Sequence, residues 1–248
     1  MRSLLFAERN VKEVLRDPIN LFFGLGFPLI LLILMSAINS NIPAEAGNAM
    51  FEINNLAPGI ATFGPVFMSL FSGMLLSKDR TSSFLMRLFT SPMTSANFIM
   101  GYTLPMILFA ICQSIITFFA AGLLGLTISA NILLAIVTLV PTTVLFIGIG
   151  LLCGSLMNDK AVGGICGALL TNVAGWLSGI WFPIELVGGR FKTLCQWLPF
   201  YHGAQATKDA ISGRFNDILP NLAVVSIYAV VIYIVAIMVF RRKMSSGK

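Results

Sequence analysis

The chain has 248 residues, of which 57% are hydrophobic and only 10% are charged, and its mean hydropathy is +0.89. A soluble domain is about a quarter charged, and a core formed by a chain of this length could not bury so much apolar surface. The composition therefore excludes an ordinary soluble globule and indicates a protein whose main solvent is lipid.

The first 18 residues are predicted to form an amphipathic helix that lies in the membrane interface. Its apolar positions recur at helical spacing and are Leu4, Ala7, Val11, Val14 and Leu15. Glu8 and Lys12 are spaced for an ion pair on one helix face. Asp17 precedes Pro18, and a residue before proline is pushed out of the helical region. We therefore expect the helix to end there and the chain to turn into the bilayer at Ile19.

Six apolar stretches approach or exceed the roughly 20 residues that cross a bilayer as helix. They are Ile19–Ala37, Ala57–Ser77, Phe98–Leu126, Ile132–Leu156, Val162–Phe182 and Ile218–Phe240. No Asp, Glu, Lys or Arg lies inside any of them. The sequence predicts an all-α integral membrane protein, with residues 1–248 forming one transmembrane domain.

The placement of Lys and Arg predicts the orientation, because short loops rich in these residues stay in the cytoplasm. Basic residues precede the first span and follow the second, fourth and sixth, including the tail 241–248. The protein is thus expected to be a multi-pass plasma (inner) membrane protein with both termini in the cytoplasm. The net charge of +6 fits attraction to membrane lipid headgroups and is not interpreted as nucleic-acid binding.

Residues 78–95, after the second span, are predicted to contain a short cytoplasmic surface helix. Thr81 or Ser82 can cap it, and Pro92 stops it. Its apolar stripe is Phe84, Leu85, Leu88 and Phe89. Two interpretations stay open: a connector that lies on the headgroups, and a docking element for a cytoplasmic partner.

A second cytoplasmic turn, Asn158–Asp159–Lys160, is either a smaller contact for the same partner or a solvated turn. Residues 183–217 are too apolar for a plain loop. Their prolines and aromatics, among them Pro183, Trp197 and Pro199, suit short, partly re-entrant helices at the outer interface, and Glu185 belongs to the same segment. A second short helix is predicted from Gly203 to Ile211, ending at Gly213.

Uncharged polar residues and small residues occur inside the spans. Gln113, Thr142, Thr143 and Asn172 are candidates for a substrate path, although each is also suited to hydrogen bonding between helices. Three glycine pairs keep the GxxxG interval and predict close helix packing in spans four and five. They are Gly150 with Gly154, Gly163 with Gly167, and Gly175 with Gly179.

Several motifs are absent from the sequence. It has no GxxxxGK followed by Ser or Thr, no HExxH, no GxSxG and no Cys/His metal spacing. The chain is therefore expected to bind no ATP, metal or other cofactor itself and to be no enzyme. The single histidine, His202, is interpreted as a surface residue near the outer face without an evident partner.

The order of elements resembles the membrane subunit of type-2 ABC exporters, the ABC-2 permease family. Three segments carry the resemblance: Arg9 to Pro18 as an interfacial helix, Asp79 to Pro92 and on to Gly101 as a coupling helix, and Phe182 to Gly213 as a re-entrant outer segment. The resemblance implies a six-span half-transporter that dimerises, more often as a homodimer than with a related permease. It also implies docking of two separate ATP-binding cassette subunits, which would hold ATP and Mg²⁺. The residues that it assigns to ATPase coupling are Asp79, Arg80, Thr81, Phe84, Leu85, Arg87, Leu88 and Pro92.

The substrate class expected from the uncharged spans is a hydrophobic or amphipathic compound, such as a drug, antibiotic, lipid or peptide. Two alternatives stay open. An ion-coupled carrier or channel would work without an ATPase, and the lack of charged residues in the spans counts against it. A membrane scaffold or immunity protein would bind another protein and move nothing.

Overall fold

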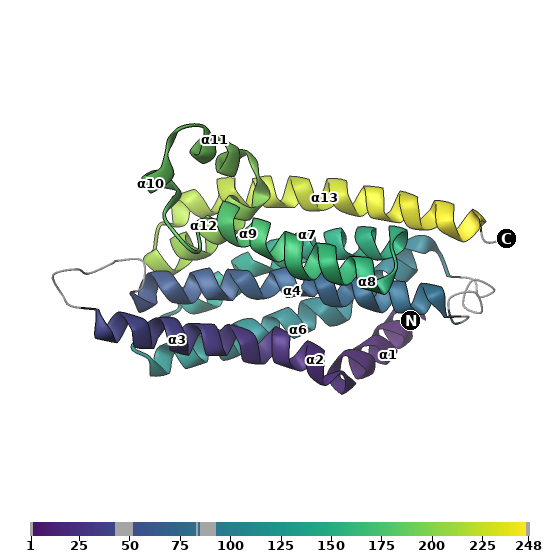
Figure 1. Cartoon of the computed structure of the whole chain (residues 1–248), viewed down its shortest axis with the longest axis horizontal. Helices are drawn as coiled ribbons and strands as arrows, with labels where there is room; N and C mark the ends of the chain where they lie inside the picture. Colours follow the sequence, from purple (N-terminus) through teal and green to yellow (C-terminus); the bar gives the residue numbers. More distant parts are fainter. Residues whose placement is uncertain (1, 43–51, 83, 85–92, 247–248) are drawn as a thin grey trace.

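The computed structural model describes residues 2–42, 52–82, 84 and 93–246, and Figure 1 shows them as a bundle of long, roughly aligned helices. No strand occurs among these residues. Within them, six segments are long and apolar enough to cross a membrane. These segments are Pro18–Asn41, Ile53–Thr81, Ser95–Leu123, Asn131–Leu156, Asp159–Leu177 and Phe215–Lys243. The prediction of an all-α protein with six spans is confirmed.

The N-terminal helix α1 (Arg2–Arg16) ends where the sequence predicts. Asp17 has extended backbone angles, and its carboxylate accepts a hydrogen bond from the Ile19 N–H at 3.0 Å. The first span then follows as α2 (Pro18–Leu21), a π-helical segment η1 (Phe22–Gly26) and α3 (Phe27–Asn41). In Figure 1, α1 is set at an angle to α3, which is consistent with a chain that turns at this cap.

The second span, α4 (Ile53–Thr81), is the centre of the bundle and is buried along most of its length. It packs against α6 (Ser95–Leu123) and most extensively against α7 (Asn131–Leu156). A Cβ atom on Gly150 would collide with the Ser69 carbonyl, and one on Gly154 would collide with the Gly73 carbonyl. This glycine pair therefore allows backbone contact between α4 and α7, as its spacing predicts. The Gly163 position, in contrast, has no atom within 4 Å.

The first, fifth and sixth spans lie at the periphery, and most of their side chains are at least partly exposed. The fifth consists of α8 (Asp159–Val162), η4 (Gly163–Leu170) and α9 (Thr171–Leu177). The sixth is α13 (Phe215–Ser246). Their exposed residues are mostly large and apolar, for example Leu169, Ile227 and Val230. Surfaces of this kind are stable only against lipid or another apolar surface.

Three short helices cover the end of the bundle opposite the two termini (Figure 1). They are α10 (Ile184–Val187), α11 (Gly189–Trp197) and α12 (Pro199–Ser212). The fifth span ends at Leu177, before the predicted Phe182, and the chain turns at Gly179, whose φ is +70°. The predicted start of the second short helix at Gly203 is also wrong. This helix, α12, begins at Pro199, and the first turn of a helix is a position that suits proline. Its end at Gly213, with a left-handed φ of +75°, is as predicted.

Candidate coupling site

The helix α1 is docked onto the bundle by a face that includes Ala7 and Val14 of the predicted apolar stripe. Its buried side chains are Phe6, Ala7, Asn10 and Val14, whereas Leu4 and Leu15, predicted in the apolar stripe, are 61% and 53% exposed. The buried face includes a polar residue because Asn10 donates a hydrogen bond to the Gly101 carbonyl of α6 at 3.0 Å. The exposed leucines are left to contact lipid.

A buried carboxylate holds α1 to the end of α4. The Asp79 side chain is only 5% exposed, and both its oxygens accept hydrogen bonds from the Arg9 guanidinium, at 2.5 and 2.9 Å. The Tyr102 hydroxyl of α6 donates a third bond at 2.8 Å. A bidentate guanidinium–carboxylate pair is among the strongest polar contacts in proteins, so three helices meet at this single acid.

The charge of Arg9 is stabilised by its surroundings. Burial opposes the charged form, but hydrogen bonding and attraction from Asp79, with help from Glu13, raise the pKa of Arg9 above its ordinary value. Arg9 also pairs with Glu13 one turn along α1, and its guanidinium donates to the Asn10 amide oxygen. The guanidinium is therefore charged at any physiological pH.

Phe84, the described residue of the predicted coupling stripe, packs on α1. Its ring is stacked with Phe6, with centroids 6.4 Å apart, and the Arg9 guanidinium lies 4.5 Å from its centroid. A cation over an aromatic face is attracted by the ring quadrupole. Phe84 is thus in direct contact with the residue that pairs with Asp79.

Asp79, Arg80 and Thr81 belong to the last turn of α4, so the prediction that they begin a separate surface helix is wrong. Arg80 is turned toward the neighbouring span, where its guanidinium donates to the main-chain carbonyls of Ser155 and Met157 at the end of α7. Thr81 donates to carbonyls of its own helix. The two Arg80 contacts place its charge on main-chain carbonyls at the end of α7, where a helix leaves carbonyls without intrahelical donors.

The remaining members of the predicted coupling set, Leu85, Arg87, Leu88 and Pro92, lie outside the described residues, and their role stays a prediction. The second turn is described. Asn158 caps α8 by accepting from the Ala161 N–H at 2.9 Å, and Asn158 and Lys160 are exposed while Asp159 is partly exposed. The turn lies directly beside the α7 end that Arg80 holds.

The four candidates for a substrate path are not brought together. Gln113, Thr142 and Thr143 are buried between helices of the same chain, whereas Asn172 is exposed and bonds to the Ala168 carbonyl of its own helix. Two of their oxygens, Gln113 Oε1 and Thr142 Oγ1, are buried without a hydrogen-bond partner. In the single chain, the first three therefore face helix contacts and no open path.

The outer segment places its predicted residues on different surfaces. Pro199 is buried, Pro183 and Glu185 line a cavity, and Trp197 is 74% exposed. The expectation that His202 lacks a partner is wrong: its ring nitrogens lie 2.7 Å from Asn221 Oδ1 and 2.8 Å from the Gln196 carbonyl. These bonds join α11, α12 and α13.

The fold defines the class of protein. It is a six-span integral membrane protein whose N-terminal helix α1 is held against the bundle by the Arg9–Asp79 pair. A family model described as ABC-2 type transporter matches residues 3–211, and the chain belongs to this family. It is a membrane permease component of a transporter, not a catalytic domain, and such components generally work with cytoplasmic ATP-binding subunits. The comparison with curated proteins found no match.

The sequence did not identify Asn10 and Tyr102 as site residues. Arg9 entered only as the first residue of a segment that carries the family resemblance. One signal was present: Asp79 is the only acidic residue between Glu52 and Asp159. An acidic side chain at the end of a long apolar span must either reach water or pair with a cation, because an unpaired buried charge is costly. Which arginine supplies it is decided by contacts 70 residues apart.

Proposed function

We propose that this chain is the transmembrane permease subunit of an ATP-driven exporter, coupled to a separate ATP-binding subunit through the segment after α4. The observation that carries the proposal is the Arg9–Asp79–Tyr102 cluster, which ties α1, α4 and α6 together beside Phe84. A partner that displaces this segment would move α1 and two spans together. Coupling between distant sites needs such a two-state element, biased by each of its ligands.

The proposal places both termini and residues 78–95 on the cytoplasmic side of the plasma membrane, in agreement with the distribution of basic residues. It assigns ATP and Mg²⁺ to the partner and a hydrophobic or amphipathic substrate to the permease. Two copies of the chain would pair, since identical subunits most often form symmetric dimers. The exposed apolar faces of the peripheral spans leave surface for that contact.

The first experiment asks whether an ATPase subunit accompanies the tagged chain when it is purified in mild detergent from its native host. We expect a soluble subunit whose ATP hydrolysis vanadate inhibits. The chain purified alone, stable and without ATPase activity, would contradict the proposal. Gradient-driven transport by that chain in liposomes would then identify a channel or carrier, and its absence would favour a scaffold.

A second experiment tests the coupling segment with the double variant Phe84→Asp/Leu88→Asp. We expect it to insert into the membrane and to lose at least about 90% of the co-purified ATPase, because buried carboxylates without partners strongly oppose docking. The matched control is Leu186→Asp, an equivalent change at an 80% exposed position on α10, which should retain the ATPase. Since Phe84 also packs on α1, Leu88→Asp alone separates partner docking from α1 docking. Retention of the ATPase by both Leu88 variants would exclude this segment as the contact.

A further inference from the structure

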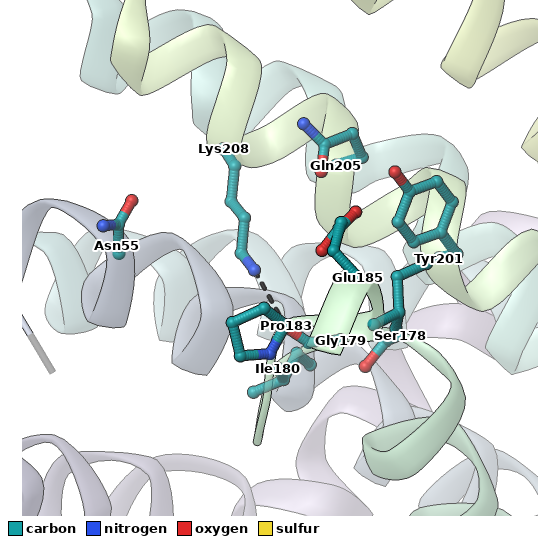
Figure 2. A pocket seen from close by; sticks show the side chains of 10 residues that line it. Asn55, Ser178, Gly179, Ile180, Pro183, Glu185, Tyr201, Gln205 and Lys208 are labelled. Atoms are coloured by element: carbon teal, nitrogen blue, oxygen red, sulfur yellow. Dashed lines mark hydrogen bonds between the residues drawn. The ribbon is translucent and has the colours of Figure 1, made fainter. Parts of the chain in front are cut away.

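A cavity of about 220 Å³ opens at the end of the bundle opposite the termini (Figure 2). Its walls come from the first turn of α4, the turn after α9, α10 and α12. It is smaller than the sites that hold drug-sized ligands, which measure roughly 300–1,000 Å³. A small polar group, or the polar end of a larger molecule, suits this volume.

Two opposite charges face the cavity from different elements. Lys208 reaches in from α12 and donates one hydrogen bond, to the Gly179 carbonyl at 3.0 Å. Glu185 comes from α10, and in the view of Figure 2 its carboxylate lies between the Lys208 ammonium and Tyr201. Among the ion pairs of the described residues, Lys208 and Glu185 are not joined. The cavity therefore keeps a cation and an anion on separate walls.

The acid adjacent to Lys208 in sequence does not neutralise it. Asp209 is 1% exposed and accepts hydrogen bonds from the Arg214 guanidinium at 2.6 and 2.9 Å and from the Gln205 amide at 2.8 Å. Asn221 of α13 donates to its other oxygen at 3.3 Å. The carboxylate of Asp209 thus bonds to Arg214, Gln205 and Asn221, and Glu185 is the acid that lines the cavity.

Burial leaves the Lys208 ammonium poorly solvated. Burial lowers the pKa of Lys208 despite the attraction of Glu185 and Asp209, so its ammonium has lost water that an anion could replace. Burial, together with the charges of Glu185 and Asp209, raises the pKa of Tyr201. Its hydroxyl therefore stays protonated, and its aromatic ring can face a cation.

The cavity also lies where the spans end: α4 begins at Ile53, α9 ends at Leu177 and α13 begins at Phe215. Nearby, the exposed Trp197 accepts a hydrogen bond from the Tyr228 hydroxyl through its carbonyl. Trp and Tyr concentrate at the level of lipid headgroups.

From this arrangement we infer that the cavity binds a zwitterion whose phosphate pairs with Lys208 and whose ammonium pairs with Glu185. The chemistry is that of phosphoethanolamine, either free or as the headgroup of phosphatidylethanolamine. The inference does not depend on ATP-driven transport.

The test uses the full chain in nanodiscs with equal amounts of phosphatidylethanolamine and phosphatidylglycerol, followed by native mass spectrometry of retained lipid. We expect phosphatidylethanolamine to be retained at least about fivefold over phosphatidylglycerol, which lacks the ammonium. Lys208→Gln and Glu185→Gln should each reduce its retention about tenfold, as expected for the loss of one charge-assisted contact. Arg190→Gln, an equal change at an exposed position of α11, is the matched control and should have no effect.

Folding is checked by thermal unfolding of each variant. Glu185 is exposed, so Glu185→Gln tests the proposal even where Lys208→Gln does not fold. Equal retention of the two lipids, or retention that neither variant reduces, would overturn the inference. Soluble phosphoethanolamine is then added as a competitor. Displacement of the lipid identifies the free zwitterion as a ligand too, whereas no displacement assigns the site to the lipid. Both outcomes agree with the proposed chemistry.

Discussion

Replacing Arg9 by methionine would leave the Asp79 carboxylate buried with one donor from the described part of the chain, the Tyr102 hydroxyl. Breaking a buried ion pair by removing one partner costs about 3–5 kcal/mol. The low end applies here, because the Arg9 side chain is 34% exposed and Tyr102 still donates to the acid. At ~1.4 kcal/mol per factor of ten, a loss of about 3 kcal/mol shifts the docking equilibrium of α1 toward the undocked state about 100-fold.

The assay places a thiol on the docked face of α1 by Val14→Cys, at a position that is 3% exposed. N-ethylmaleimide modifies this thiol only when α1 leaves the bundle, and mass spectrometry of the α1 peptide reads the rate directly. Introducing Arg9→Met into the Val14→Cys protein should raise the rate of N-ethylmaleimide labelling about 100-fold. The control Lys12→Met breaks the exposed Lys12–Glu8 pair and should change it about twofold or less.

A double variant, Arg9→Met/Asp79→Asn, separates the charge from the packing. Asparagine removes the uncompensated charge and still offers Tyr102 an acceptor, so the labelling rate should return most of the way to that of the parent protein. Two results would refute the reasoning: a single variant that reacts no faster than the Lys12→Met control, or a double variant that reacts faster than Arg9→Met alone.

Three further predictions concern other parts of the molecule. Gly154→Ala should lower the thermal midpoint by several degrees, because overpacking against the α4 backbone costs about 1–3 kcal/mol; Gly163→Ala, with no atom within 4 Å, should not lower it. Asn158→Ala should cost about 1 kcal/mol through loss of the α8 cap, while Asn158→Ser retains it; equal unfolding midpoints in denaturant would count against the cap. Since burial lowers the pKa of Lys208, the folded chain releases that proton at lower pH than the unfolded chain, so stability should rise with pH between the lowered value and about 10.4. Lys208→Met should remove that rise in unfolding measured at several pH values. The charged and titratable groups around this ammonium are Glu185, Tyr201 and Asp209.

Sequence alone was enough for the architecture, because a span is recorded locally in about 20 consecutive apolar residues. The six spans, the end of α1 at Asp17–Pro18 and the end of α12 at Gly213 all follow from such local signals. The Gly150–Gly154 interval predicted a close helix contact for the same reason. In the identical Gly163–Gly167 interval, however, a Cβ atom on Gly163 would meet nothing within 4 Å and one on Gly167 would meet only the Leu70 side chain. Spacing shows that helices could approach, and only the fold shows which do.

The tertiary structure alone decided how the polar residues are used. Periodicity placed Leu4 and Leu15 in one apolar stripe with Ala7 and Val14, but only the latter two are buried in the bundle. In a membrane protein the outward face is apolar too, so hydrophobicity does not distinguish bundle from lipid. The face that docks carries Asn10, whose amide donates a hydrogen bond to the Gly101 carbonyl of α6. For the same reason, the partners of Asp79 and the separate charges of Lys208 and Glu185 come from helices far apart in the chain. No local pattern encodes such pairings, since they depend on how the helices pack.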